Sequence, residues 1–247
     1  MSRWKAAGIH LSISLFIGLI IGVLLLTVWY PPPFFHGAGA DELVILLVGV
    51  DVTLGPLITL IIFKSGKKSL KFDLTVIAVL QSAALIYGLW VVLQSRPVFL
   101  VATIDRFVLV SANELEIEDL NNGSKPEFRN LSWVGPRLVA VELPTDPAQH
   151  NALLTSGLAG KDVEKFPKYY IDYDKAVTRL LAKAHPFETL RQSDAANSAI
   201  LDNFLKKNAL KDSDVLWLPL TARKQDMTML ISAATGKPIK ALPINPW

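Results

Sequence analysis

The chain divides into long apolar runs followed by short alternating ones. Three runs, at residues 9–29, 43–63 and 74–93, carry few charged residues. Each is long enough to cross a bilayer, because about 20 helical residues span the hydrocarbon core. The pattern therefore predicts three transmembrane helices joined by short loops within residues 1–96.

From residue 97 onward the pattern is that of a folded, water-soluble domain. Short runs rich in β-branched and aromatic residues predict strands at 97–105, 106–110 and 137–144, and then a hairpin at 215–222 and 227–234. Two helices are expected before the hairpin. Their expected apolar faces are Ala176, Val177, Leu180, Leu181 and Ala184 in the first, and Ile200, Leu201, Phe204 and Leu205 in the second. This order of elements predicts an α+β domain with an antiparallel sheet over residues 97–247.

Lysine and arginine are distributed unevenly around the three spans. Arg3 and Lys5 precede the first span, and the loop at 64–71 holds four lysines. The loop at 31–42 holds no lysine or arginine. The positive-inside rule places the N-terminus and the loop at 64–71 in the cytoplasm. Three crossings then put residues 97–247 on the outer side of the membrane.

The composition narrows the function classes. The chain has 25 Lys and Arg against 22 Asp and Glu, and the small excess does not form a nucleic-acid-binding signature. The absence of cysteine excludes disulfides, a thiolate nucleophile and cysteine-based metal sites. The four histidines are scattered, and no phosphate-binding, dinucleotide-binding or nucleophile-elbow motif occurs. We therefore expect no catalytic residue, no cofactor and no metal site.

Small residues form a stripe in the first span. Ser14, Gly18 and Gly22 recur every four residues, so they share one helix face and allow another helix to approach closely. His10 lies one turn earlier on the same face. The stripe is interpreted either as packing within the bundle or as a docking surface for a partner helix.

Asp51 lies near the middle of the second span. A carboxylate at that depth costs about 3 kcal/mol or more, so it is usually hidden, paired or used. Gly55 and Pro56, which follow it, weaken the same helix. Gln81, Ser82 and Tyr87 of the third span are candidate hydrogen-bond donors to it. The alternatives are a buried group that locks the helices together, a partner contact, and a proton or ion path, which no second mid-membrane charge supports.

Five segments form a specific combination: WYPPPFF at 29–35, DELVILLVGVDVTLGPLITLIIF at 41–63, KSGKKSLKFDL at 64–74, SRPVFLV at 95–101 and IDRFVLV at 104–110. Together they resemble the TfpX/TfpZ family of type IV pilin accessory proteins. The resemblance is strongest over residues 29–115. The residues matched to the family pattern are Trp29, Tyr30, Pro31, Pro32, Asp51, Gly55, Pro56, Lys67, Lys68, Phe72, Asp73, Asp105 and Arg106.

The resemblance implies an accessory protein of the bacterial inner membrane with a periplasmic C-terminal domain. Such a protein assists type IV pilin accumulation or pilus assembly, with the pilin or the assembly platform as its partner, and it carries no active site. It contacts the lipid bilayer and no nucleic acid, and its oligomeric state stays open. The alternative is a membrane-tethered enzyme or transport component that uses Asp51, and a membrane-anchored sensor would need a cytoplasmic output module.

Overall fold

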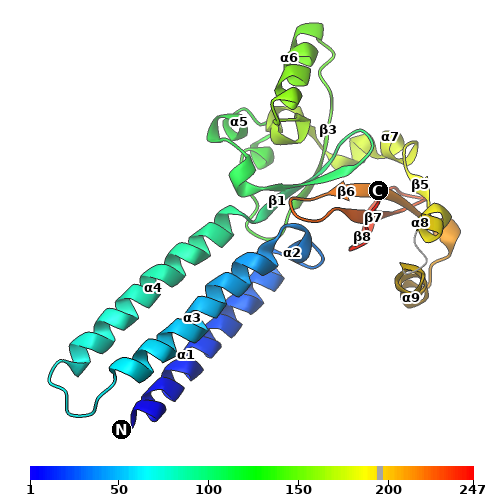
Figure 1. Ribbon diagram of the computed structural model, residues 1–247. Coiled ribbons are helices and arrows are strands. Elements are labelled where there is room, and N and C mark those ends of the chain that lie inside the picture. The colour runs from blue at the N-terminus through cyan, green and yellow to red at the C-terminus, as the bar shows by residue number, and fades with distance from the viewer. Residues whose placement is uncertain (194–196) are drawn as a thin grey trace.

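The computed structural model describes residues 1–193 and 197–247 of the chain. Long helices lie side by side at one end of the molecule, and a domain of strands and shorter helices sits at their other end (Figure 1). The N-terminus and the loop between the second and third long helices lie together at the end farthest from the sheet.

Three helices in the described part of the chain are long and apolar enough to cross a membrane. They are α1 (Arg3–Leu24), which continues as a π-helical turn (Leu25–Trp29), α3 (Ala40–Ile62) and α4 (Leu70–Gln94). The first begins at Arg3, where Ser2 caps it by accepting a hydrogen bond from the amide of Lys5. Pro56 lies inside α3, which continues past it to Ile62. A short helix, α2 (Phe34–Gly37), connects α1 to α3.

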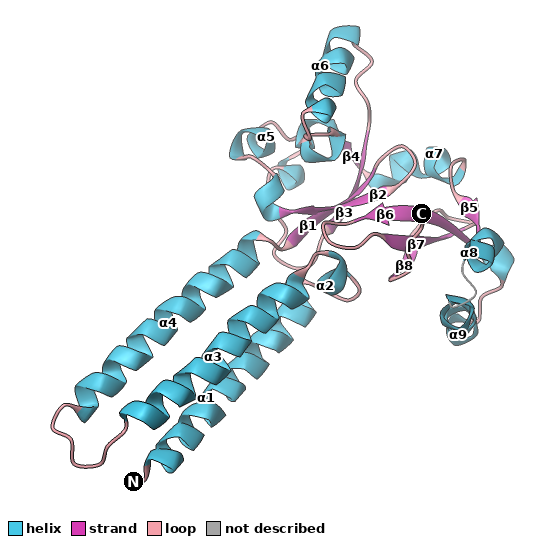
Figure 2. Ribbon diagram, viewed as in Figure 1, coloured by secondary structure: helices cyan, strands magenta, loops and turns pink. Residues whose placement is uncertain are grey.

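The strands form one eight-stranded sheet within the described residues, in the order β4-β3-β1-β2-β6-β7-β8, with β5 paired to β6. Their bounds are β1 Pro97–Ala102, β2 Phe107–Ser111, β3 Arg137–Val141, β4 Tyr170–Ile171, β5 His185–Pro186, β6 Val215–Thr221, β7 Met227–Ser232 and β8 Pro238–Leu242. The three predicted early strands and the late hairpin are all present. Figure 2 shows how the shorter helices surround this sheet.

The sheet is mixed, so the predicted purely antiparallel arrangement is wrong. β3 runs parallel to β1, and β6 runs parallel to β2. The reason is the long connections, which contain helices and carry the chain across the sheet before it returns beside an earlier strand. Parallel neighbours require crossovers of this kind, whereas a short turn produces only antiparallel neighbours.

Five short α-helices of the described residues accompany the sheet: α5 Ile117–Asn121, α6 Pro147–Leu158, α7 Val177–Leu181, α8 Phe187–Ser193 and α9 Ser198–Asn208. The second predicted helix corresponds to α9, although Ile200 is 42% exposed and does not face inward as expected. The first is shorter than expected, because only Val177–Leu181 is α-helical and a 3₁₀ turn precedes it.

The central strands are buried on both faces. In β1, Leu100 and Ala102 belong to one apolar cluster, whereas Phe99 and Val101 belong to another on the opposite face. The second cluster includes Leu120 of α5 and Leu153 of α6. Alternate residues of a strand point to opposite faces, so this strand serves two cores.

The first of these clusters reaches into the membrane part of the molecule. It includes Leu25 and Tyr30 after α1 and Val92 of α4, together with Leu100 of β1 and Met227 of β7. The helical bundle and the sheet therefore share one continuous apolar core rather than two cores joined by a linker.

Candidate functional site

The small-residue stripe of α1 faces α3. Ser14 is buried, and a side chain placed on Gly18 would come within 3.2 Å of Val48 in α3. One turn away, His10 Nδ1 lies 2.7 Å from the hydroxyl oxygen of Thr59. A side chain placed on Gly22 would meet no atom within 4 Å. The first part of the stripe thus packs inside the bundle, and its last residue has open space beside it.

Asp51 pairs with Gln81 across the α3–α4 interface. The Nε2 atom of Gln81 lies 3.3 Å from Oδ1 of Asp51 and donates a hydrogen bond to it. The Gln81 amide occupies the space directly beside Gly55, where a side chain would collide with it. Gly55 therefore creates the room in which the glutamine reaches the aspartate.

At a second point on this interface, a large side chain of one helix again packs into the space beside a glycine of the other. Gly88 of α4 accepts the side chain of Leu47 of α3, just as Gly55 of α3 accepts Gln81 of α4. The two other candidate donors do not take part. Ser82 is exposed, and Tyr87 is 67% exposed and stacks on Trp90 instead.

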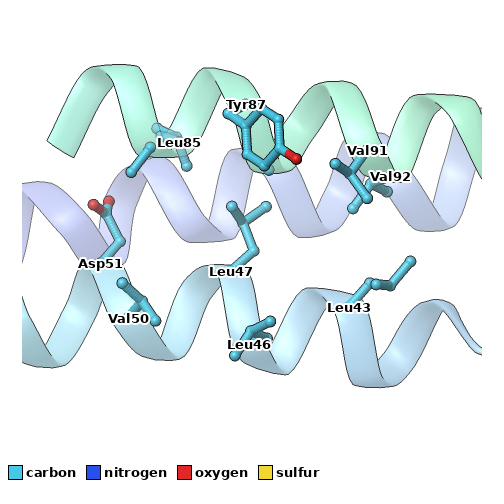
Figure 3. Close-up of a pocket in the computed structure, with 11 residues that line it drawn as sticks. Leu43, Leu46, Leu47, Val50, Asp51, Leu85, Tyr87, Val91 and Val92 are labelled. Atoms are coloured by element: carbon cyan, nitrogen blue, oxygen red, sulfur yellow. The ribbon is translucent and has the colours of Figure 1, made fainter. Parts of the chain in front are cut away.

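An apolar groove runs between α3 and α4 on the outer surface of the bundle. Its cavity volume is about 350 Å³, and Asp51 is the one charged residue among the described residues that line it. Figure 3 shows Asp51 extending from α3 toward α4, with Leu47 and Leu43 farther along the same helix and Leu85, Tyr87 and Val91 on the opposite wall. The groove combines an apolar surface with a single carboxylate at membrane depth.

The predicted residues Trp29, Tyr30 and Pro31 lie where the first span ends and the sheet begins. Tyr30 is fully buried, and its hydroxyl donates a hydrogen bond of 2.6 Å to the carbonyl oxygen of Val92 in α4. Burial raises the pKa of the Tyr30 phenol, which stays protonated and keeps donating. Pro31 lies against Gly135, the residue that precedes Pro136 and β3.

Two further contacts tie the α2 segment to the β6–β7 hairpin. The amide of Lys224 donates to the carbonyl oxygen of Gly37 at 2.9 Å, and the Met227 side chain packs directly against Gly37. The Lys224 ammonium lies 2.7 Å from a carboxylate oxygen of Glu42, and this hydrogen bond raises the pKa of the lysine. We call residues 29–42 together with their partners from the sheet domain the collar.

Asp105 and Arg106 lie far from the groove, in the turn between β1 and β2. The Arg106 guanidinium donates to both carboxylate oxygens of Asp105, at 2.9 and 3.2 Å. It also lies 5.2 Å from the ring centre of Trp247, whose indole nitrogen donates to Asp226. The pair thus holds the turn and the C-terminal segment together, at a distance from the membrane residues that were predicted with it.

The sequence-based candidates therefore fall into three places: the bundle interior and its groove, the collar, and the β1–β2 turn. Sequence reasoning missed the collar partners Lys224 and Met227, because their contacts connect segments separated by most of the chain. Among the described residues, no group of three or more His, Asp or Glu side chains is arranged to hold a metal ion.

These features define a membrane protein with a three-helix bundle and a tightly attached α+β domain. Comparison with known proteins gives this class a more specific identity. The family described as "Fimbrial assembly protein FimB" matches residues 1–39. "Fimbrial assembly protein, serogroups C1 and C2" from Dichelobacter nodosus is 33% identical over 118 residues, which cover 47% of this chain and 90% of that relative. The chain belongs to the fimbrial assembly protein family.

A longer relative aligns with most of the chain. "Fimbrial assembly protein, serogroup I" from Dichelobacter nodosus is 27% identical over 230 residues, which cover 92% of this chain and 89% of the relative. The protein of serogroup E1 has the same identity and coverage. No solved structure matches the chain.

Proposed function

We propose that this protein is an accessory protein of the TfpX/TfpZ type that supports type IV pilin stability or pilus assembly through non-catalytic contacts. The names of its relatives support a role in fimbrial assembly. In this proposal the protein lies in the bacterial inner membrane, with its N-terminus and the loop at 64–71 in the cytoplasm and the α+β domain in the periplasm. The lysines of that loop support this orientation.

The observation that carries the proposal is the groove between α3 and α4. A pilin subunit waits in the membrane on a single apolar helix, and a groove of this kind offers such a helix close packing and one polar contact. Helix association in lipid depends on packing and on interhelical hydrogen bonds, because lipid is as apolar as the side chains themselves. A second contact at the periplasmic domain would increase the effective concentration of the partner at the groove.

The Asp51 groove fits a partner helix better than the stripe on α1 does. Ser14 and Gly18 already pack against α3, so little of that face is free. Val50 and Tyr87, in contrast, line the groove and are 42% and 67% exposed. We therefore assign the partner contact to the groove and the bundle packing to the stripe.

The alternative, an enzyme or transport component that uses Asp51, has less support. The Asp51 carboxylate already accepts a hydrogen bond from Gln81. The other acidic residues of the three described spans, Asp41, Glu42 and Asp73, lie in the first turns of their helices rather than beside Asp51. A relay needs a second ionisable group at similar depth.

Disulfide crosslinking tests the contact directly, because the chain contains no cysteine. Single cysteines at Val50 and Tyr87 are each combined with a cysteine scan along the pilin helix, in cells that lack the wild-type copy. The control is Phe16→Cys, near the middle of α1 and 64% exposed on the lipid side. We expect pilin adducts from the groove positions and background adducts from Phe16. Equal trapping at all three positions would contradict the groove assignment.

Deletion of the gene tests the broader role. Pilin immunoblots and surface-pilus counts are compared with the wild type and with a complemented strain. We expect less pilin or fewer pili in the deletion, and recovery on complementation. Unchanged pilin level and piliation would reject the proposed function.

A further inference from the structure

The loop that precedes β3 exposes two large apolar side chains. Trp133 and Val134 are 65% and 72% exposed, although the residues on either side of the pair are partly or fully buried. Gly135 is buried and has a φ of +56°, a conformation in which glycine is free of Cβ strain. The backbone of the loop thus turns toward the protein while the two side chains point away from it.

Hydrogen bonds hold this loop at the level where two spans end. The amide of Gly135 donates to the carbonyl oxygen of Val28, in the last turn of the first span, at 2.7 Å. The Arg96 side chain, two residues after α4, donates from Nε to the carbonyl oxygen of Ser132 at 3.1 Å. Trp133 and Val134 therefore lie level with the sheet-side ends of both helices.

The chemistry of the loop matches the interfacial layer of a bilayer. The Arg96 guanidinium lies 4.9 Å from the ring centre of Trp133, and it also donates to the carbonyl oxygen of Leu93 in the last turn of α4. Tryptophan is enriched at the headgroup level, since its ring is apolar and its N–H is polar. Arg96 itself is buried, and its hydrogen bonds to the carbonyl oxygens of Leu93 and Ser132 fix the loop at the end of α4.

We propose that residues 131–136 form a membrane-contact loop, which places Trp133 and Val134 in the interfacial layer of the leaflet on the sheet side. The partner of this surface is the phospholipid bilayer. The loop belongs to the α+β domain, so the domain touches the lipid in addition to being connected to the spans. This contact holds the side of the sheet domain that faces the long helices against the membrane.

The absence of cysteine allows a direct measurement of depth. Val134→Cys carries a nitroxide label in the full-length protein, reconstituted into nanodiscs of phosphatidylethanolamine and phosphatidylglycerol. Electron paramagnetic resonance then compares collisions of the label with oxygen, which concentrates in lipid, and with a water-soluble nickel complex. Two control positions are Leu54→Cys, 48% exposed in the middle of α3, and Ala148→Cys, exposed at the start of α6, which projects away from the long helices (Figure 1).

We expect the oxygen-to-nickel collision ratio at position 134 to be several-fold higher than at 148 and lower than at 54. Circular dichroism and size-exclusion profiles that match the unlabelled protein confirm that each variant is folded. A ratio at 134 equal to that at 148 would overturn the proposal, because the loop would then lie in water and its apolar pair would be free for a protein partner.

Discussion

The Asp51 carboxylate is held in place by its hydrogen bond with Gln81. The Gln81 amide donates to its carboxylate, and Gly55 provides the space for that contact. The pair places a hydrogen-bonded polar group at the edge of the groove, so the carboxylate is held in position without a counter-charge. Two substitutions separate its hydrogen-bonding capacity from its charge.

We expect Asp51→Asn to keep pilin level and piliation near those of the wild type, and Asp51→Leu to reduce both. Asparagine retains a carbonyl oxygen that accepts from Gln81, whereas leucine leaves the partly buried amide with only its longer contact, 3.5 Å, to the backbone oxygen of residue 51. Pilin immunoblots and pilus counts measure the outcome. A defect of equal size in both variants would assign the role to the negative charge.

Gly55→Ala should destabilise the bundle by about 1–3 kcal/mol, the usual cost of overpacking a filled interior. The added methyl group would occupy the place of the Gln81 amide. Gly49→Ala is the matched control in the same helix, because a methyl group there meets no atom within 4 Å. Thermal unfolding in detergent measures the difference, and equal melting temperatures would show that the Gln81 side chain moves aside at no cost.

Glu164, in the soluble domain, should make stability depend on pH. Burial raises the pKa of its carboxyl above the ordinary value, so the folded state holds the proton more tightly than the unfolded state. Stability is then lost as pH rises from the ordinary pKa of glutamate through the raised value. Glu164→Gln removes this penalty. We expect the melting temperature of the variant to exceed that of the wild type at neutral pH and to equal it in acid. A difference in melting temperature that stays constant across pH would show that the titration of Glu164 is not its cause.

At the scale of elements, α1 packs against α3 along the small-residue stripe, where Gly18 lies beside Val48. Gly18→Leu should destabilise this pair more than Gly22→Leu does, by about 1–3 kcal/mol. The two changes have the same helix propensity and lie one turn apart, but only position 18 meets a neighbour, Val48. Thermal unfolding of both variants in the same detergent is the measurement. Equal destabilisation would assign the effect to the leucine itself.

The elements that the sequence predicted well are those with local signals. The three apolar runs became α1, α3 and α4, and the β-branched runs became β1, β2 and the β6–β7 hairpin. The parallel pairing of β3 with β1 and of β6 with β2 had no such signal, since it depends on where long connections return the chain. The helix α6 was missed because its apolar face is weak, although Asp146 as N-cap and Pro147 at the first position would have indicated it.

The candidate site was predictable in part for the same reason. A carboxylate in an apolar run is visible in the sequence, and the Gln81 contact follows from helix depth. The groove beside them depends on how α4 packs against α3, and the reciprocal pair of Gly88 and Leu47 that sets this packing cannot be recognised without the structure. The collar contacts to Lys224 and Met227 were likewise beyond reach.

At the scale of the whole molecule, the collar should make the bundle and the sheet domain move as one body. Nitroxide labels at Ala148→Cys and Ser65→Cys, at opposite ends of the molecule, should give a single narrow distance distribution by pulsed electron paramagnetic resonance. Adding Gly37→Leu should broaden it, because the leucine would displace the Met227 side chain. Gly8→Leu is the control, since no atom lies within 4 Å of that position. Equal widths with and without Gly37→Leu would show that the collar does not hold the two parts together.

The collar also has a consequence for biogenesis. The segment that leaves the first span is made well before its partners Lys224 and Met227, because the second and third spans and most of the sheet lie between them in the chain. The sheet-side end of the bundle therefore stays incomplete until the β6–β7 hairpin has been made. A chain that ends before residue 222 would still insert its three helices, but it would expose Gly37 and the apolar surface around it. Quality-control proteases at the membrane would then meet an exposed apolar surface in any product that lacks the β6–β7 hairpin.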